Sequence, residues 1–168
     1  FKKLSVVVTA FGADELSLFH RFAALWFSAM DMRAHGLPQR MQRFYERVSS
    51  ERERALVELP ELFTNDIHFM NPVVDEMGMD KFYAQWMRAF SMYKTFHFEG
   101  FYVTGDDQRF IMSYTMMNGF VIGTVFTIKL TTECWARDGK ICKMRDEFDV
   151  MGTFLQPFPL LTWMYRSA

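Results

Sequence analysis

The chain has 168 residues, and its formal net charge at pH 7 is −1. A chain of this length is expected to form one domain with a sizeable core. The near-neutral charge argues against nucleic-acid binding, which normally requires a strongly basic surface. No apolar run approaches the ~20 residues that a membrane-spanning helix needs, so we expect no transmembrane segment.

Half of the residues are apolar, with 19 Phe and 14 Met among them. Such side chains pack irregular interiors and line apolar pockets or oligomer interfaces. The two cysteines, Cys134 and Cys142, flank an expected turn at residues 137–140, and both face inward by parity. A disulfide between them is one interpretation. Free thiols in a reducing compartment are favoured, which predicts a cytoplasmic location.

The sequence lacks the motifs of the common metal and cofactor sites. Its four histidines form no i, i+4 pair and there is no cysteine cluster, so we expect no metal. It also has no glycine-rich phosphate loop and no Ser-His-Asp spacing. We therefore expect no cofactor.

Residues 1–36 are expected to form an N-terminal extension. Residues 4–11 are a strand-like run, and residues 14–32 carry apolar side chains at the i, i+3, i+4 spacing of one helix face. A Gly-Leu-Pro sequence at residues 36–38 interrupts this pattern, because Gly ends helices and Pro starts them. The main domain is therefore expected to span residues 37–168.

The main domain begins with helical patterns and continues with strands. Apolar stripes at helical spacing mark residues 41–48, 56–63 and 79–90, and after Lys94 the apolar period changes to two. The expected inward positions of the later strands include Phe96, Phe98, Tyr102, Phe110, Met112, Tyr114, Met116, Phe126, Ile128, Leu130, Thr132 and Cys134. This order predicts an α+β domain, a curved antiparallel sheet over about three helices, with an extra helix in the N-terminal extension.

The last strand, in residues 139–152, carries a carboxylate on its apolar face. Alternation places Met144, Asp146 and Phe148 inward. Burying an unpaired carboxylate costs several kcal/mol, so Asp146 must be paired, protonated or next to a polar cavity. Apolar surroundings would raise its pKa and suit it to proton transfer. The alternative is a core carboxylate held by a Tyr, Trp or Arg donor.

Three pieces of the sequence occur in a familiar order: LPELFTNDIHFMNPV, GMDKFYAQWMRAF, and four strands ending in GKICKMRDEFD. Residues 37–168 resemble the nuclear transport factor 2 superfamily in its SnoaL-like and ketosteroid-isomerase-like branch. RDEFD and PFPLLTWMYR are similar to the last strand and tail of a bacterial SnoaL-like subgroup. The resemblance implies a cone-shaped curved sheet and about three helices around one deep apolar pocket, often in a homodimer. It also implies that the partner is a small apolar molecule.

The ketosteroid-isomerase residues are largely absent. In that branch an Asp before a Pro carries the proton, and here Asn71 precedes Pro72. The amide of Asn71 cannot act as a general base. The second acid of the branch, which donates to the oxyanion, corresponds to Thr132. Its helix tyrosine corresponds to Tyr45 or, if displaced, to Phe44. The ketosteroid-isomerase mechanism is therefore not expected.

The remaining candidates are polar or aromatic side chains that would contact a ligand. Asn71 is expected either to orient a ligand or to cap the turn before Pro72. The tyrosine hydroxyls are expected either to contact the ligand or to be satisfied within the core. The candidate ligand-binding residues are Asn71, Tyr45, Tyr114, Thr132, Phe126, Phe148 and Trp86.

Three functions are compatible with this pattern. The first is a cofactor-independent isomerase, dehydratase or hydrolase that acts on a small apolar substrate, with Asp146 as acid or base. The second is a non-catalytic carrier or sensor whose pocket holds an apolar ligand. The third is a protein-interaction module, in which the sheet surface and the tail matter more than a pocket.

Overall fold

The protein is described by a computed structural model, which covers residues 36–120, 125–156, 158, 163–165 and 167. The predicted N-terminal extension, with its strand-like run and extra helix, lies outside the described residues except for Gly36. No helix among the described residues is long and apolar enough to cross a membrane.

Most of the helices precede the long antiparallel strands in the described chain, as the periodicity predicts. The helices are α2 (Leu37–Glu51), the 3-10 helix η2 (Arg52–Glu58), α3 (Leu59–Leu62), α4 (Met79–Met92) and α5 (Val150–Leu155). The strands are β1 (Phe63–Asn71), β2 (Val74–Met77), β3 (Tyr93–Gly105), β4 (Arg109–Phe120), β5 (Val125–Arg137) and β6 (Lys140–Glu147). The predicted α+β class is confirmed.

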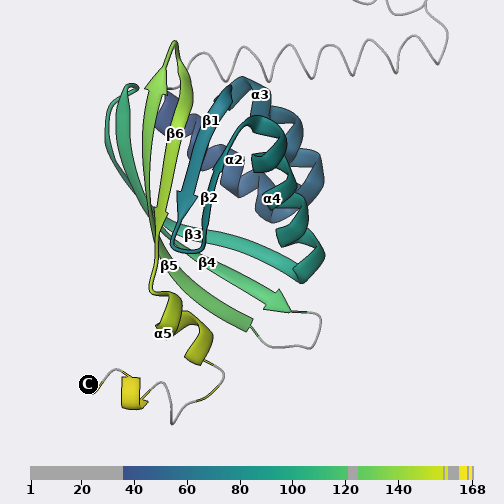
Figure 1. The fold of residues 1–168 in the computed structure, drawn as a ribbon, viewed down its shortest axis with the longest axis vertical. Coiled ribbons are helices and arrows are strands. Elements are labelled where there is room, and N and C mark those ends of the chain that lie inside the picture. The colour runs from purple at the N-terminus through teal and green to yellow at the C-terminus, as the bar shows by residue number, and fades with distance from the viewer. Residues whose placement is uncertain (1–35, 121–124, 157, 159–162, 166, 168) are drawn as a thin grey trace, which may run out of the picture. The chain divides into compact units, whose positions relative to one another are not determined.

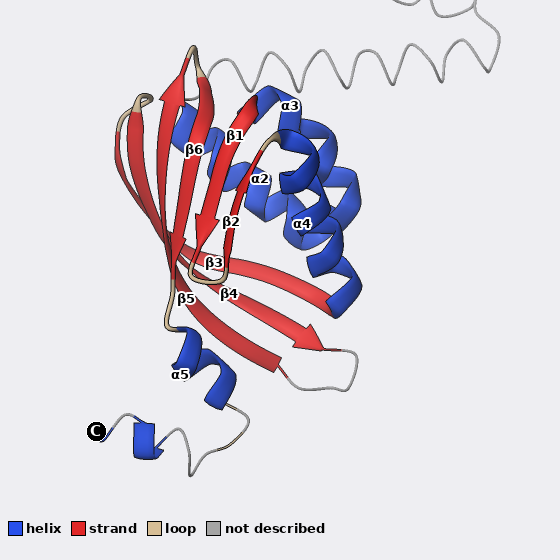
Figure 2. Cartoon of the chain, in the orientation of Figure 1, coloured by secondary structure: helices blue, strands red, loops and turns tan. Residues whose placement is uncertain are grey.

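The six strands form one curved sheet in the order β2-β1-β6-β5-β4-β3. Figure 1 shows α2, α3 and α4 on one side of this sheet, and Figure 2 shows β3, β4 and β5 curling beneath them. The sheet is mixed, which corrects the prediction of a wholly antiparallel one, because β1 pairs with β6 in parallel. A parallel pair needs a long connection. Here α4 and four strands lie between β1 and β6 in the chain.

Helix α2 is fixed at its start by a residue far along the chain. Pro38 lies in its first turn, and the backbone N–H of Leu37 donates to Oδ1 of Asp107 at 2.6 Å. A Cβ at Gly36 would lie only 2.7 Å from the same oxygen, so a glycine is needed for this approach. The first N–H groups of a helix have no acceptor within the helix, and the Asp107 carboxylate supplies one for Leu37.

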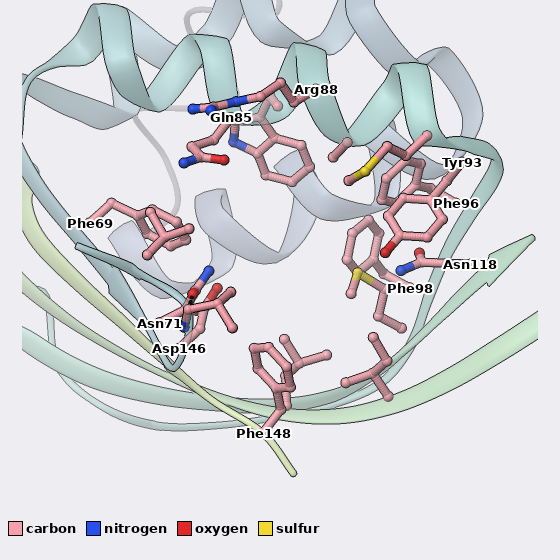
Figure 3. A pocket seen from close by; sticks show the side chains of 18 of the residues that line it. Phe69, Asn71, Gln85, Arg88, Tyr93, Phe96, Phe98, Asn118, Asp146 and Phe148 are labelled. Atoms are coloured by element: carbon pink, nitrogen blue, oxygen red, sulfur yellow. Dashed lines mark hydrogen bonds between the residues drawn. The ribbon is translucent and has the colours of Figure 1, made fainter. Parts of the chain in front are cut away.

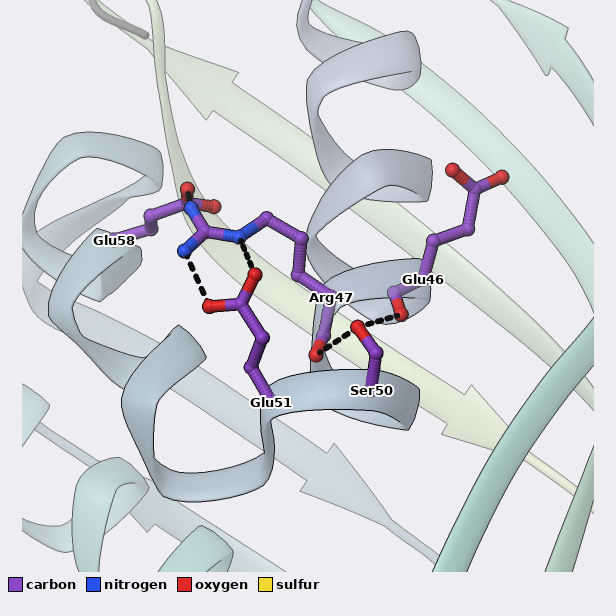
Figure 4. Close-up of polar contacts among 5 residues, drawn as sticks. All are labelled: Glu46, Arg47, Ser50, Glu51 and Glu58. Atoms are coloured by element: carbon purple, nitrogen blue, oxygen red, sulfur yellow. Dashed lines mark hydrogen bonds and ion pairs between the residues drawn. The ribbon is translucent and has the colours of Figure 1, made fainter. Parts of the chain in front are cut away.

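The end of α2 is joined to η2 by Arg47, as Figure 4 shows. Its guanidinium donates to both carboxylate oxygens of Glu51, at 2.7 and 3.0 Å, and also forms an ion pair with Glu58. Glu58 is buried, so a cation is needed beside its carboxylate. This contact holds the turn between the two helices against the domain.

The apolar faces of the helices and strands meet in one core. In α2 the stripe of Met41, Phe44, Tyr45 and Val48 is buried. Trp86 on α4 and Phe44 make a T-shaped contact, with ring centroids 5.6 Å apart. The long strands β4 and β5 alternate as predicted, and their buried residues include Phe110, Met112, Tyr114, Ile128, Leu130, Thr132 and Cys134. Side-chain direction on this concave face is therefore set by strand parity.

One predicted inward residue faces the other way. Tyr102 is 70% exposed, while its neighbour Phe101 packs against the core. The pairing of β3 with β4 shifts between Glu99 and Tyr102, and Gly100 has a φ of +67°. A bulge inserts a residue and so exchanges the two faces of the strand beyond it.

The cysteines are both free, as favoured from the sequence. Cys134 is buried, and Cys142 is half-buried with its Sγ 3.4 Å from the carbonyl oxygen of Trp135.

Candidate functional site

A cavity of about 450 Å³ lies between the concave face of the sheet and α4. This volume falls in the range of pockets that hold drug-sized molecules. The walls are mostly apolar and aromatic, and the residues that form them include Phe69, Phe82, Trp86, Phe96, Phe98, Met116, Phe126, Ile128, Leu130, Met144 and Phe148. A few polar side chains interrupt this lining, among them Asn71, Gln85, Asn118 and Asp146, which Figure 3 labels.

Asp146 lies on β6 and lines the cavity. Its backbone partner on β5 is Thr132, and the Thr132 hydroxyl lies 2.6 Å from Oδ1 of Asp146, donating to it when the carboxyl is ionised. Oδ2 has no hydrogen-bond partner in the described part of the chain. Burial raises the pKa of the Asp146 carboxyl to about 7, and the hydrogen bond from Thr132 opposes this rise.

Two buried tyrosines extend the series of hydroxyl contacts that begins with Asp146 and Thr132. The Tyr114 hydroxyl is 3.0 Å from the Thr132 hydroxyl and donates to the Tyr45 hydroxyl at 3.2 Å. These groups come from β4, β5 and α2. Burial raises the pKa of Tyr45 and of Tyr114 well above the ordinary tyrosine value, so both hydroxyls stay protonated at neutral pH.

Each hydroxyl in this series carries one proton and can donate one hydrogen bond. The Thr132 hydroxyl donates its proton to Oδ1 of Asp146, and the Tyr114 hydroxyl donates its proton to Tyr45. The carboxyl therefore accepts a hydrogen bond from this series, and that bond favours the ionised form of Asp146.

The predicted ligand-binding residues gather around this cavity. Seven of the eight candidate residues line it: Asp146, Asn71, Tyr45, Tyr114, Phe126, Phe148 and Trp86. Thr132 lies behind Asp146 and is fully buried. Their roles in binding or catalysis remain predictions.

Asn71 shows the turn geometry that was the alternative to a ligand contact. Its Oδ1 accepts a hydrogen bond from the backbone N–H of Val73 at 2.9 Å. The side chain still lines the cavity, and its amide nitrogen makes no hydrogen bond among the described residues. The turn fixes the carbonyl of Asn71 and leaves the N–H groups available to a ligand.

Sequence reasoning missed Asn118 on β4. This side chain is fully buried, lines the cavity, and has no hydrogen-bond partner for either amide atom among the described residues. The signal was present, because the inward alternation through Tyr114 and Met116 continues to Asn118.

Helix α4 adds polar groups at the edge of the cavity. Gln85 and Ser91 line it, and so does the exposed Arg88, whose guanidinium lies 3.3 Å from a carboxylate oxygen of Glu76. No cluster of three or more His, Cys, Asp or Glu side chains that could hold a metal ion occurs in the described ranges.

Comparison with solved structures places this arrangement in a known fold. A protein from Catenulispora acidiphila with a ketosteroid isomerase-like fold, in complex with trimethylamine, matches with a TM-score of 0.58 at 14% identity, over 68% of this chain and 88% of that one. A proposed polyketide cyclase from Pseudomonas putida matches with a TM-score of 0.60 at 14% identity, over 69% and 93%. A proposed SnoaL-like polyketide cyclase from a Jannaschia species matches with a TM-score of 0.58 at 13% identity, over 67% of this chain and 88% of that one.

These likenesses establish the fold and no activity, because identities this low do not carry a function from one protein to another. The domain has the nuclear transport factor 2-like fold that the sequence resemblance implied. No protein-family model matches the sequence, and a search of curated proteins gives no match.

Proposed function

We propose that the domain is an enzyme that binds a small, mostly apolar molecule in the cavity and transfers a proton through Asp146. The observation that carries the proposal is the position of a carboxyl on the wall of an apolar cavity, where burial raises its pKa to about 7. A general acid or base works best when its pKa lies near the operating pH. Proton transfer of this kind serves isomerisation, dehydration and hydrolysis.

In this proposal each carboxyl oxygen has a separate task. Thr132 bonds to Oδ1, which fixes the orientation of the carboxyl, and Oδ2 is the atom that exchanges a proton with the substrate. Tyr114 holds Thr132 in place from behind. A ligand that fills the cavity would displace water and raise the pKa of Asp146 further, because desolvation disfavours the charged carboxylate.

The proposed chemistry differs from that of ketosteroid isomerases. Asn71 stands in the place of the proton-carrying acid, and its amide does not titrate at working pH. Thr132 stands in the place of the second acid, and its hydroxyl is directed to Asp146 and Tyr114 instead of the cavity. Proton transfer therefore rests on one carboxyl, supplied by β6.

The alternative is a carrier or sensor that binds the same kind of ligand without turnover. It is favoured by one observation: of the described residues that line the cavity, Asp146 is the one carboxylic acid, so no second acid assists it. The open cavity weighs against the interaction module, which predicts an interior filled by side chains. We further infer a cytoplasmic homodimer, for which the free cysteines support the location and the fold resemblance supports the dimer.

The test compares the wild type with Asp146→Asn and with the control Glu147→Gln, an exposed neighbour on the other face of β6. Native mass spectrometry of the wild type, set against its denatured mass, identifies a bound small molecule, whose conversion is then assayed. We expect Asp146→Asn to bind it and to lose turnover, while Glu147→Gln keeps both. Turnover by Asp146→Asn would exclude Asp146 as the proton carrier. Binding without turnover in the wild type would favour the carrier.

A further inference from the structure

Asn118 is an unpaired polar side chain inside an apolar wall. It is fully buried, and neither its Nδ2 nor its Oδ1 has a hydrogen-bond partner in the described part of the chain. Buried polar atoms nearly always have a partner, because water bonded to them in the unfolded state. An amide without partners therefore lowers stability unless another molecule completes its bonds.

The two strand partners of Asn118 are phenylalanines, whose side chains offer its amide no hydrogen bond. Its backbone partners are Phe96 on β3 and Phe126 on β5. Figure 3 shows the amide beside Phe96 and Phe98, across the cavity from Asp146. The side chain lines the cavity, so a molecule in the cavity can reach it.

Asn118 and Asp146 define two separate polar points on one apolar surface. The β5 partner of Asp146 is Thr132 and that of Asn118 is Phe126, six residues apart on the strand. At about 3.3 Å per residue, the two points are separated by roughly 20 Å measured along the strand. Between them the inward residues are Ile128 and Leu130, both buried.

We propose that Asn118 is a second anchor of the ligand, which binds an uncharged hydrogen-bonding group such as a hydroxyl or a carboxamide. The ligand is then an elongated molecule with an apolar middle, one polar end at Asn118 and its reacting group at Asp146. This inference rests on the proposed function, because it places the ligand in the same cavity. An amide both donates and accepts, so it suits an uncharged group and not an ion.

The proposal separates stability from recognition. Replacing Asn118 with Leu, which has a similar size, removes the unpaired amide from an apolar wall and should raise the thermal unfolding midpoint. The same change removes the anchor and should weaken binding of molecules with a polar end. If instead a buried water completes the amide, the substitution changes stability and leaves selectivity among ligands as it was.

The experiment uses three probes with one apolar body: 4-hydroxybiphenyl, biphenyl-4-carboxamide and 4-methylbiphenyl. Their dissociation constants are measured by calorimetry on the full chain, for the wild type, Asn118→Leu and the smaller Asn118→Ala, in case the first variant does not fold. The control is Asn65→Ala, at an exposed asparagine on β1. We expect the wild type to prefer the hydroxyl and carboxamide probes over the methyl probe by roughly 10- to 100-fold.

The preference should disappear in both Asn118 variants and persist in Asn65→Ala. The proposal is overturned if the wild type binds none of the probes, binds all three equally, or keeps its preference after Asn118 is replaced. Failure of the proposed proton transfer is a separate result. Turnover that survives in Asp146→Asn leaves the role of Asn118 in selectivity unaffected.

Discussion

The Thr132 hydroxyl lies 2.6 Å from Oδ1 of Asp146, and the two residues stand directly opposite each other on β5 and β6. It is the single hydrogen bond that the carboxyl makes within the described ranges. Burial and this bond act on the pKa of Asp146 in opposite directions, and burial dominates. The proton affinity of the candidate acid is therefore set by one contact and by the apolar wall around it.

The pKa of Asp146 should be about 7 in the folded protein. Carbon-13 NMR of labelled aspartate carboxyls follows this titration directly. In Thr132→Val the pKa should rise further, because the hydrogen bond that favours the ionised form is lost. Thr132→Ser keeps the hydroxyl and should leave the pKa close to that of the wild type. A titration midpoint near 4 in the wild type would contradict the assignment.

Asp146→Asn should stabilise the protein at high pH. The folded-state pKa of Asp146, about 7, is above the unfolded value of about 3.9, so the native state binds more protons between these limits. The contribution of Asp146 to stability therefore falls as the pH rises from about 4 to about 7 and stays low above that. The amide that the substitution introduces does not ionise, so the variant does not lose this free energy of unfolding, which is on the order of 4 kcal/mol for a pKa shift of this size.

Urea unfolding at pH 4.0 and pH 8.0 measures the difference between Asp146→Asn and the wild type. The two proteins should be similar at the lower pH, and the variant should be more stable at the higher. Asp66→Asn is the opposite case, because the hydrogen bond from Arg137 holds the pKa of the Asp66 carboxyl below its usual value. That variant should lose stability above pH 4. An equal effect of Asp146→Asn at both pH values would refute the argument.

Tyr114→Phe should destabilise the protein by about 1–3 kcal/mol, because it leaves the buried hydroxyls of Tyr45 and Thr132 without their shared partner. Chemical denaturation at one pH measures this loss. Tyr102→Phe is the matched control, since the Tyr102 side chain is 70% exposed and should change stability little. Equal effects of the two substitutions would mean that the hydroxyl contact contributes nothing.

Asp107→Ala should cost about 1 kcal/mol, because it removes the carboxylate that accepts from the first turn of α2. Gln108→Ala, at an exposed position in the same β3–β4 turn, serves as the control. Hydrogen exchange at Leu37 locates the effect, since its amide should lose protection in the first variant alone. Unchanged protection at Leu37 would exclude this cap.

Strand parity predicted Asp146 as an inward carboxylate, because the residues on either side of it alternate cleanly between charged and apolar. The same rule places Asn118 inward, although an amide attracts less notice than a carboxylate. Parity failed at Tyr102, where a bulge exchanged the faces of β3. Bulges depend on pairing with the next strand, which alternation within one strand does not reveal.

Local periodicity, read from the chain alone, was enough to predict the α+β class and most inward positions, because side-chain direction repeats every two residues in a strand and every 3.6 in a helix. The parallel pairing of β1 with β6 and the contact between Tyr45 and Tyr114, 69 residues apart, follow only from packing. The unpaired state of Asn118 is also a tertiary property. A side chain has or lacks a partner according to what the rest of the fold brings within about 3 Å of it, and sequence spacing carries no such distance.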